Sequence, residues 1–104
     1  MGRVETRIVE TARTVYGPDI RVILYGSRAR GDYFNDSDWD IAIISPRFAS
    51  TAFVKRPVAF YRAWNGAEPV EVLCYTPEEF EKNRLGLGLA HDVATQGVVL
   101  ADRA

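Results

Sequence analysis

Two polar motifs separated by ten residues are the part of this sequence best suited to chemistry. Gly26 and Ser27 form the first motif, and Asp38 and Asp40 form the second, directly before the apolar run 41–44. A Gly-Ser turn presents backbone N–H groups and a hydroxyl that suit phosphate oxygens. Carboxylates two residues apart on a strand face the same side and can bind the same Mg²⁺ ions. Together the motifs predict a site for a metal-bound nucleoside triphosphate.

Charged residues near these motifs extend the hypothesis. Arg28 and Arg30 follow the turn, and guanidinium groups match the geometry of phosphate. Glu71 is the only charged residue in the apolar run 70–75. If its strand lies beside the strand of the two aspartates, three carboxylates gather, and two metal ions can bridge the site. The alternatives are a plain Gly-Ser turn, acids that face solvent, and arginines that pair with surface acids.

The composition predicts one soluble globular domain over residues 1–104. The chain is 47% hydrophobic and 26% charged with a net charge of −1, so no global basic field indicates direct binding of nucleic acid. No apolar run approaches the ~20 residues that span a bilayer. The N-terminus lacks the pattern of a signal peptide, and the single cysteine, Cys74, sits in an apolar run. These features predict a cytoplasmic location.

Hydrophobic periodicity predicts the elements that position the motifs. Strands are expected over residues 20–25, 39–45, 69–75 and 98–100, and helices over 4–16, 28–30, 57–64, 77–84 and, beyond Gly86 and Gly88, 89–95. The pattern of residues 48–56 is ambiguous. The order α-β-α-β-α-β-α-β indicates a small α/β or α+β domain. Because residues 39–45 are almost wholly apolar, their strand is expected in the middle of the sheet.

Several side chains have expected places within these elements. Ser27 is expected to cap the short helix that Gly31 closes. Thr76 and Glu79 form the pattern of a capping box at the start of the helix over 77–84. Trp39 alternates with the two aspartates and is expected to face the opposite side of the sheet, in the core.

In the helix over 57–64, Val58 and Tyr61 are expected to pack inward, and the aromatic residues of this helix are expected to serve packing. His91 is the only histidine. With no second histidine and no cysteine nearby, we expect it to be a surface or core residue rather than a metal ligand.

The two motifs and the acid on a later strand resemble the nucleotidyltransferase superfamily that includes DNA polymerase β. The fuller stretch 26–31, followed by 37–41, looks like the minimal (MNT) branch of that superfamily, and segment 75–80 suits it too. The resemblance covers about residues 20–100. It implies a mixed sheet of about four strands flanked by helices. It also implies transfer of a nucleoside monophosphate, AMP from ATP, to a hydroxyl with release of pyrophosphate.

The resemblance also implies roles for individual residues. Glu71 stands where the superfamily usually has an aspartate, and its side chain is one methylene longer. The implied metals are two Mg²⁺ ions, with Mn²⁺ as a substitute. The implied catalytic residues and metal ligands are Asp38, Asp40 and Glu71, and the implied phosphate ligands are Gly26, Ser27, Arg28 and Arg30.

A chain of this length has room for the triphosphate and the metals and for little else. The acceptor is therefore expected on a partner or on a second copy of the chain. Members of the MNT branch often pair with a small helical HEPN-type protein, for which the MNT chain acts as antitoxin and can transfer AMP to a tyrosine. The alternative is a catalytically silent nucleotide-binding or antitoxin module that acts on such a partner by contact.

Overall fold

The observed helices and strands alternate along the chain as the periodicity predicts. The structure is a computed structural model that describes residues 2–34, 37–83, 93 and 97–102. The helices are α1 (Arg3–Tyr16), α2 (Gly26–Arg30), α3 (Val58–Ala63) and α4 (Pro77–Asn83), and the strands are β1 (Arg21–Tyr25), β2 (Trp39–Ile44), β3 (Val70–Tyr75) and β4 (Val98–Ala101). Two 3₁₀ helices, η1 (Pro46–Ser50) and η2 (Phe53–Lys55), occupy most of the ambiguous segment. The expected helix over 89–95, apart from Val93, and His91 lie outside the described residues.

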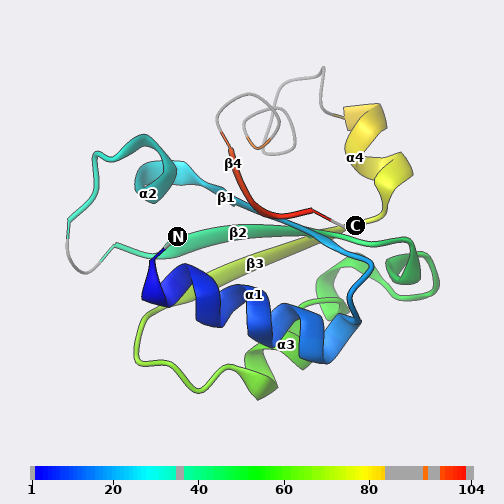
Figure 1. The fold of residues 1–104 in the computed structure, drawn as a ribbon. Helices are drawn as coiled ribbons and strands as arrows, with labels where there is room; N and C mark the ends of the chain where they lie inside the picture. The colour runs from blue at the N-terminus through cyan, green and yellow to red at the C-terminus, as the bar shows by residue number, and fades with distance from the viewer. Residues whose placement is uncertain (1, 35–36, 84–92, 94–96, 103–104) are drawn as a thin grey trace.

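The four strands form one mixed sheet in the order β3-β2-β1-β4. β1 is antiparallel to β2 and to β4, whereas β2 is parallel to β3. The parallel pair requires a long crossover, which η1, η2 and α3 provide. Helices α1 and α3 lie on one side of the sheet and α4 lies on the other (Figure 1). The expected four-stranded mixed sheet with flanking helices is confirmed, and β2 is central.

Neighbouring residues of β2 point to opposite faces of the sheet. Ile41 and Ile43 are buried in the core beneath α1 and α3, and Ala42 is buried in the second core beside α4. Burial on both faces explains why this strand is an unbroken apolar run. Trp39 packs against the first core, which confirms its expected place, and Asp40 shares the face of Ala42.

Helix α3 turns a different face inward from the one that its sequence predicts. Phe60 is fully buried, whereas Val58 and Tyr61 are 39% and 44% exposed. Pro57 occupies the N-cap position and the helix begins one residue later, and Phe60 packs in the first core. The Tyr61 hydroxyl instead accepts a hydrogen bond of 2.7 Å from the backbone N–H of Val72. Tyr61 therefore covers part of the outer edge of β3.

Arg56, in the segment with the ambiguous pattern, joins three parts of the fold. Its side chain is 6% exposed and forms two hydrogen bonds, of 2.6 and 3.1 Å, with the Glu79 carboxylate. It also donates to the carbonyls of Cys74 and Thr51. Glu79 and Thr76 form the expected capping box at the start of α4. Arg56 thus ties the crossover to β3 and to α4.

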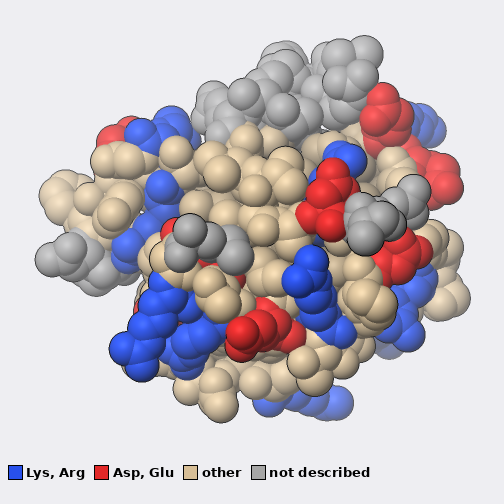
Figure 2. Space-filling model, viewed as in Figure 1, with Lys and Arg blue, Asp and Glu red and all other residues tan. Residues whose placement is uncertain are grey.

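Charged side chains are distributed over the molecular surface. On the face that Figure 2 shows, acidic and basic side chains are interspersed and form no field of a single sign. Within the ranges that the structure describes, no helix is long and apolar enough to cross a membrane.

The Arg56–Glu79 pair gives a first prediction. Replacing Arg56 with methionine should lower the free energy of unfolding at pH 7 by about 2–3 kcal/mol, because the buried Cys74 carbonyl and the Glu79 carboxylate lose their donor. Hydrogen bonds from Arg56 and from the Thr76 backbone lower the pKa of Glu79. The wild type therefore loses this contribution as the pH falls through that lowered pKa.

Urea denaturation at pH 7 and at pH 3.5 checks this prediction. The difference between the wild type and Arg56→Met should shrink at the lower pH. Glu79→Gln serves as the matched control, because it removes the titrating group and keeps the capping geometry. An Arg56→Met chain as stable as the wild type at pH 7 would contradict the role given to the pair.

Candidate active site

The Gly-Ser turn lies directly against one of the acids. Gly26 follows the last residue of β1 and has a φ of 75°, which favours glycine. The β1–β2 register pairs Tyr25 with Asp40, so the turn meets Asp40 at the end of the sheet. A Cβ atom at position 26 would collide with the Oδ2 atom of Asp40. The turn therefore requires glycine because a carboxylate occupies the space, a reason that the sequence does not reveal.

The expected capping role of Ser27 is wrong. Helix α2 begins at Gly26, and Tyr25 occupies the N-cap position without a side-chain cap. The helix begins two residues earlier than predicted, at Gly26, whose φ is 75°. Gly31 ends the helix as expected, with a φ of 84° and a hydrogen bond of 2.9 Å from its N–H to the Ser27 carbonyl.

Two of the three predicted acids are neighbours across the parallel strands. Asp40 pairs in register with Glu71, and the parity of the strands puts both on the face that α4 covers. Asp38 lies just before β2 and is exposed. Burial, then the charges of Glu71 and Asp38, raise the pKa of Asp40, and Arg30 lowers it. The site is thus a concentration of negative charge at one end of the sheet.

The donor set of this site suits a hard divalent cation. Within residues 2–34, 37–83, 93 and 97–102, no three His, Cys, Asp or Glu side chains are gathered closely enough to hold a metal ion by themselves. Mg²⁺ commonly takes one or two protein carboxylates and completes its shell with water and substrate phosphates. Asp40 and Glu71 match that requirement, and Asp38 lies close enough to influence Asp40 electrostatically.

The two arginines of α2 have different surroundings. Arg30 is exposed and forms an ion pair of 3.3 Å with Asp32, yet its charge also reaches Asp40. Arg28 donates to the backbone carbonyl of Ser37, and its guanidinium group lies over two aromatic rings. Phosphate binding by either arginine stays a prediction.

Sequence reasoning overlooked Tyr25, the residue before the turn. It is 5% exposed and lies in the core beside α4. Burial, then the charges of Asp40 and Glu71, raise the pKa of its phenol. Tyr25 therefore stays protonated. Its neutral phenol lies close enough to Asp40 and Glu71 for their charges to act on it. Its only sequence signal is its position as the last residue of an apolar strand directly before the Gly-Ser pair.

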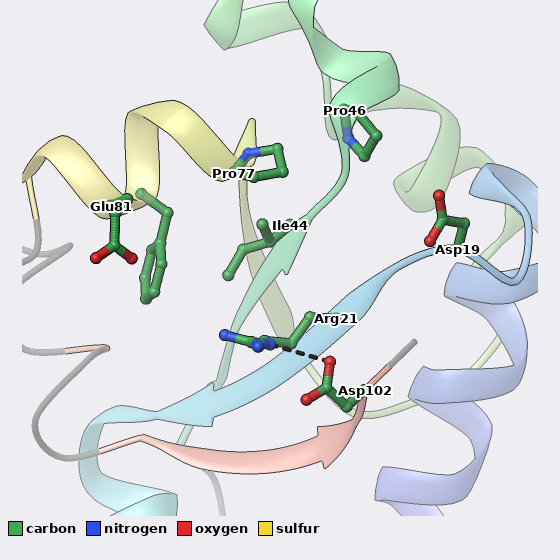
Figure 3. Close-up of a pocket in the computed structure, with 8 residues that line it drawn as sticks. Asp19, Arg21, Ile44, Pro46, Pro77, Glu81 and Asp102 are labelled. Atoms are coloured by element: carbon green, nitrogen blue, oxygen red, sulfur yellow. Dashed lines mark hydrogen bonds and ion pairs between the residues drawn. The ribbon is translucent and has the colours of Figure 1, made fainter. Parts of the chain in front are cut away.

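A pocket lies at the other end of the sheet (Figure 3). It contains Arg21, the first residue of β1, and Ile44, the last residue of β2. An ion pair of 3.2 Å between Arg21 and Asp102 borders it. The register pairs Arg21 with Ile44 at this end and Tyr25 with Asp40 at the other. The pocket is therefore separate from the predicted site, whose acids and turn lie at the opposite end of these two strands.

Comparisons with known proteins identify the family and agree with the observed fold. The sequence profile of the nucleotidyltransferase domain family matches residues 6–94. A candidate nucleotidyltransferase from Sulfolobus solfataricus has a similar structure, with a TM-score of 0.66 and 24% identity over 96% of this chain and 78% of that one. A toxin–antitoxin structure with AMP-PNP gives a TM-score of 0.56 and 21% identity over 94% of this chain and 73% of that one. At these identities the two likenesses show the fold alone. The comparison with curated proteins gives no match.

The contact between Gly26 and Asp40 gives a second prediction. Gly31→Ala should cost about 1–2 kcal/mol of stability, because only its left-handed backbone is strained, and no atom lies within 4 Å of the added methyl group. Gly26→Ala carries similar strain and a collision with Asp40, so it should cost at least about 1 kcal/mol more.

Urea denaturation of both alanine variants measures the difference, and the Asp40→Ala background tests its cause. In that background the two glycine substitutions should cost nearly the same. Equal costs for Gly26→Ala and Gly31→Ala in the wild-type chain would show that the predicted collision is absent.

The charge cluster gives a third prediction. Asp40→Asn should raise the free energy of unfolding at pH 7 by about 0.5–1 kcal/mol, because it relieves repulsion between cross-strand carboxylates. The pKa of Asp40 is higher in the folded chain than in the unfolded chain, so the wild type becomes relatively more stable as the pH falls toward 4. The advantage of Asp40→Asn should therefore fade over that range.

Thermal denaturation between pH 4 and pH 7 checks the effect. Glu78→Gln serves as a control of opposite sign, because Glu78 lies in the first turn of α4, where a negative charge is favourable. An Asp40→Asn chain that is less stable than the wild type at pH 7 would refute the electrostatic description.

Proposed function

This chain belongs to the nucleotidyltransferase domain family, and we propose that it transfers a nucleoside monophosphate from a triphosphate to a hydroxyl acceptor, with release of pyrophosphate. Its family confirms the resemblance found in the sequence and the expectation of a transferase. The observation that carries the reaction chemistry is the parallel register that pairs Asp40 with Glu71, beside the turn at Gly26. One end of the sheet thus offers carboxylates for cations and a tight turn for phosphates.

The side chains divide into two groups in this proposal. The turn at Gly26 and Ser27 holds the β- and γ-phosphates, and Arg30 adds a positive charge at the same end of the sheet. Asp38, Asp40 and Glu71 hold the divalent cations, two Mg²⁺ ions or Mn²⁺ in their place. When bound, these ions neutralise the triphosphate and lower the pKa of the attacking hydroxyl.

The reaction is a direct displacement at the α-phosphorus. A bond forms between the acceptor oxygen and the α-phosphorus while the bond from that phosphorus to the pyrophosphate oxygen breaks. The hydroxyl proton passes to a carboxylate. We assign this role to Glu71, because it is the solvent-exposed member of the pair with Asp40. Tyr25 is neutral and buried in the core next to these acids.

The similar structures support the proposed substrate and partner. The toxin–antitoxin structure contains AMP-PNP, an ATP analogue, which supports ATP as the donor and AMP as the transferred group. In this proposal residues 1–104 supply the triphosphate site, and the acceptor hydroxyl lies on a partner chain. A small helical HEPN-type protein is the proposed partner, and a second copy of this chain is the alternative.

A second candidate function is an antitoxin or nucleotide-binding module that acts by contact without catalysis. The exposed position of Asp38 favours it, because the described acids do not form a ready-made three-ligand site. The two functions differ in one measurable respect, which is the covalent transfer of label.

A fourth prediction tests the catalytic proposal. Incubation with Mg²⁺, α-labelled ATP and the co-purified partner should label the partner or a nucleotide. Asp38→Asn and Asp40→Asn should each lower the rate at least about 100-fold, because each removes a carboxylate from the cation site. Glu78→Gln, an exposed acid on α4 away from the site, should retain the rate of the wild type.

Calorimetry with Mg²⁺ and AMP-PNP separates the two functions. Binding without any transfer would favour the contact module, and the absence of both would sink the enzyme proposal. Full activity of both asparagine variants would show that the metal assignment is wrong.

A further inference from the structure

We propose that Arg28 is a positioning residue that fixes the backbone at Asp38 for cation binding, in place of the phosphate-ligand role that its sequence position predicts. The inference rests on the proposed function, since it concerns the same site. It is carried by two observations: Arg28 donates hydrogen bonds to the carbonyl of Ser37, the residue before Asp38, and its guanidinium group stacks on two aromatic rings of the same region.

The hydrogen bonds of Arg28 converge on one carbonyl. Its Nε and Nη2 atoms both donate to the Ser37 oxygen, at 3.3 and 3.0 Å. This peptide carbonyl belongs to the bond that joins Ser37 to Asp38. A charged donor on a carbonyl makes a stronger hydrogen bond than a neutral one. Arg28 therefore holds the peptide plane from which Asp38 begins.

The faces of the guanidinium group are also engaged. Its central carbon lies 4.3 Å from the centroid of the Tyr33 ring and 4.4 Å from that of the Trp39 ring. Such distances give cation–π attraction. The Trp39 Nε1 atom is buried and has no hydrogen-bond partner among the described residues, so the indole is held by its packing against the first core and by its stacking with Arg28. Arg28 thereby links the two sides of the polar loop that carries Asp38.

Asp38 lies between two fixed points. On one side, the Ser37 N–H donates to the Phe34 carbonyl, the Ser37 hydroxyl accepts from the Phe34 N–H, and Arg28 binds the Ser37 carbonyl. On the other side, the Trp39 N–H donates to the Pro69 carbonyl at 2.9 Å. Asp38 is exposed and precedes β2, so the strand ladder alone does not fix it. The Arg28 contacts supply the missing constraint.

The second arginine of α2 provides the contrast. Arg30 is exposed, pairs with Asp32 at the surface, and its charge influences Asp40. Arg28 is half-buried and directs its Nε and Nη2 donors toward the Ser37 carbonyl. The planar fork of arginine suits a position that combines two parallel donors with stacking on two rings, and lysine lacks both features.

The experiment compares Arg28→Lys and Arg28→Ala with Arg30→Ala. Lysine keeps the charge that a phosphate contact needs and loses the fork and the stacking. Binding of ATP in EDTA, followed by chemical-shift titration, reports phosphate contacts without a metal. Binding of AMP-PNP with Mg²⁺, followed by calorimetry, adds the contribution of the cation site.

We expect both Arg28 variants to bind ATP in EDTA within about twofold of the wild type and to lose about tenfold in affinity for Mg²⁺ with AMP-PNP, as outer contacts of metal ligands typically do. Arg30→Ala should instead weaken binding in EDTA. A loss in EDTA for Arg28→Ala that Arg28→Lys restores would overturn the inference, because it would assign the phosphate contact to Arg28.

A spectroscopic measurement tests the geometry without nucleotide. With 5-fluorotryptophan in both tryptophan positions, the ¹⁹F resonance of Trp39 should shift in Arg28→Lys, and that of Trp64 should stay in place as an internal control. An unchanged Trp39 resonance would refute the stacking. These readouts do not require transfer, so an inactive wild type would refute the proposed function and leave the test of Arg28 intact.

Discussion

The close approach of Gly26 to Asp40 is the constraint on which the site depends. The antiparallel register of β1 and β2 fixes it, because the residue before the turn, Tyr25, is paired with Asp40. A side chain at position 26 would displace either the turn or the carboxylate. Strands β1 and β2 are packed on both faces, so their backbones do not separate to make room. The fold thus delivers a phosphate-type turn and a carboxylate to one place through strand pairing alone.

The parallel strand β3 places the Glu71 carboxylate beside that of Asp40. Asp40 and Glu71 are register partners, and their repulsion, together with burial, raises the pKa of Asp40. A cation would relieve that repulsion, as would the positive charge of Arg30. The same crossover that makes β3 parallel is held by Arg56, which ties it to Glu79 at the start of α4. The position of Glu71 therefore depends on an ion pair between buried Arg56 and partly exposed Glu79 at the other end of its strand.

Local patterns in the sequence predicted the features that depend on local physics. The two-residue period of β2 predicted that Trp39 and Asp40 face opposite sides of the sheet. The capping box of Thr76 and Glu79 was predictable because its partners are three residues apart. Features that depend on contacts between distant residues could not be predicted from the sequence. Arg56 meets a carboxylate 23 positions away, and the inward face of α3 is set by the packing of Phe60 in the first core. The sequence predicted three carboxylates together only if β3 lies beside β2; the fold makes these strands neighbours, pairs Asp40 with Glu71 and leaves Asp38 exposed before β2.

The position of a divalent cation tests the central claim most directly, because every role given to the acids depends on it. Crystals of the chain soaked with Mn²⁺ and AMP-PNP would reveal the metal by its anomalous scattering. We predict manganese bound by the Asp38, Asp40 and Glu71 carboxylates together with oxygens of the triphosphate, and the phosphates against the turn at Gly26. Manganese and nucleotide bound elsewhere, for example in the pocket beside Arg21, with no metal at Asp40, would contradict the account.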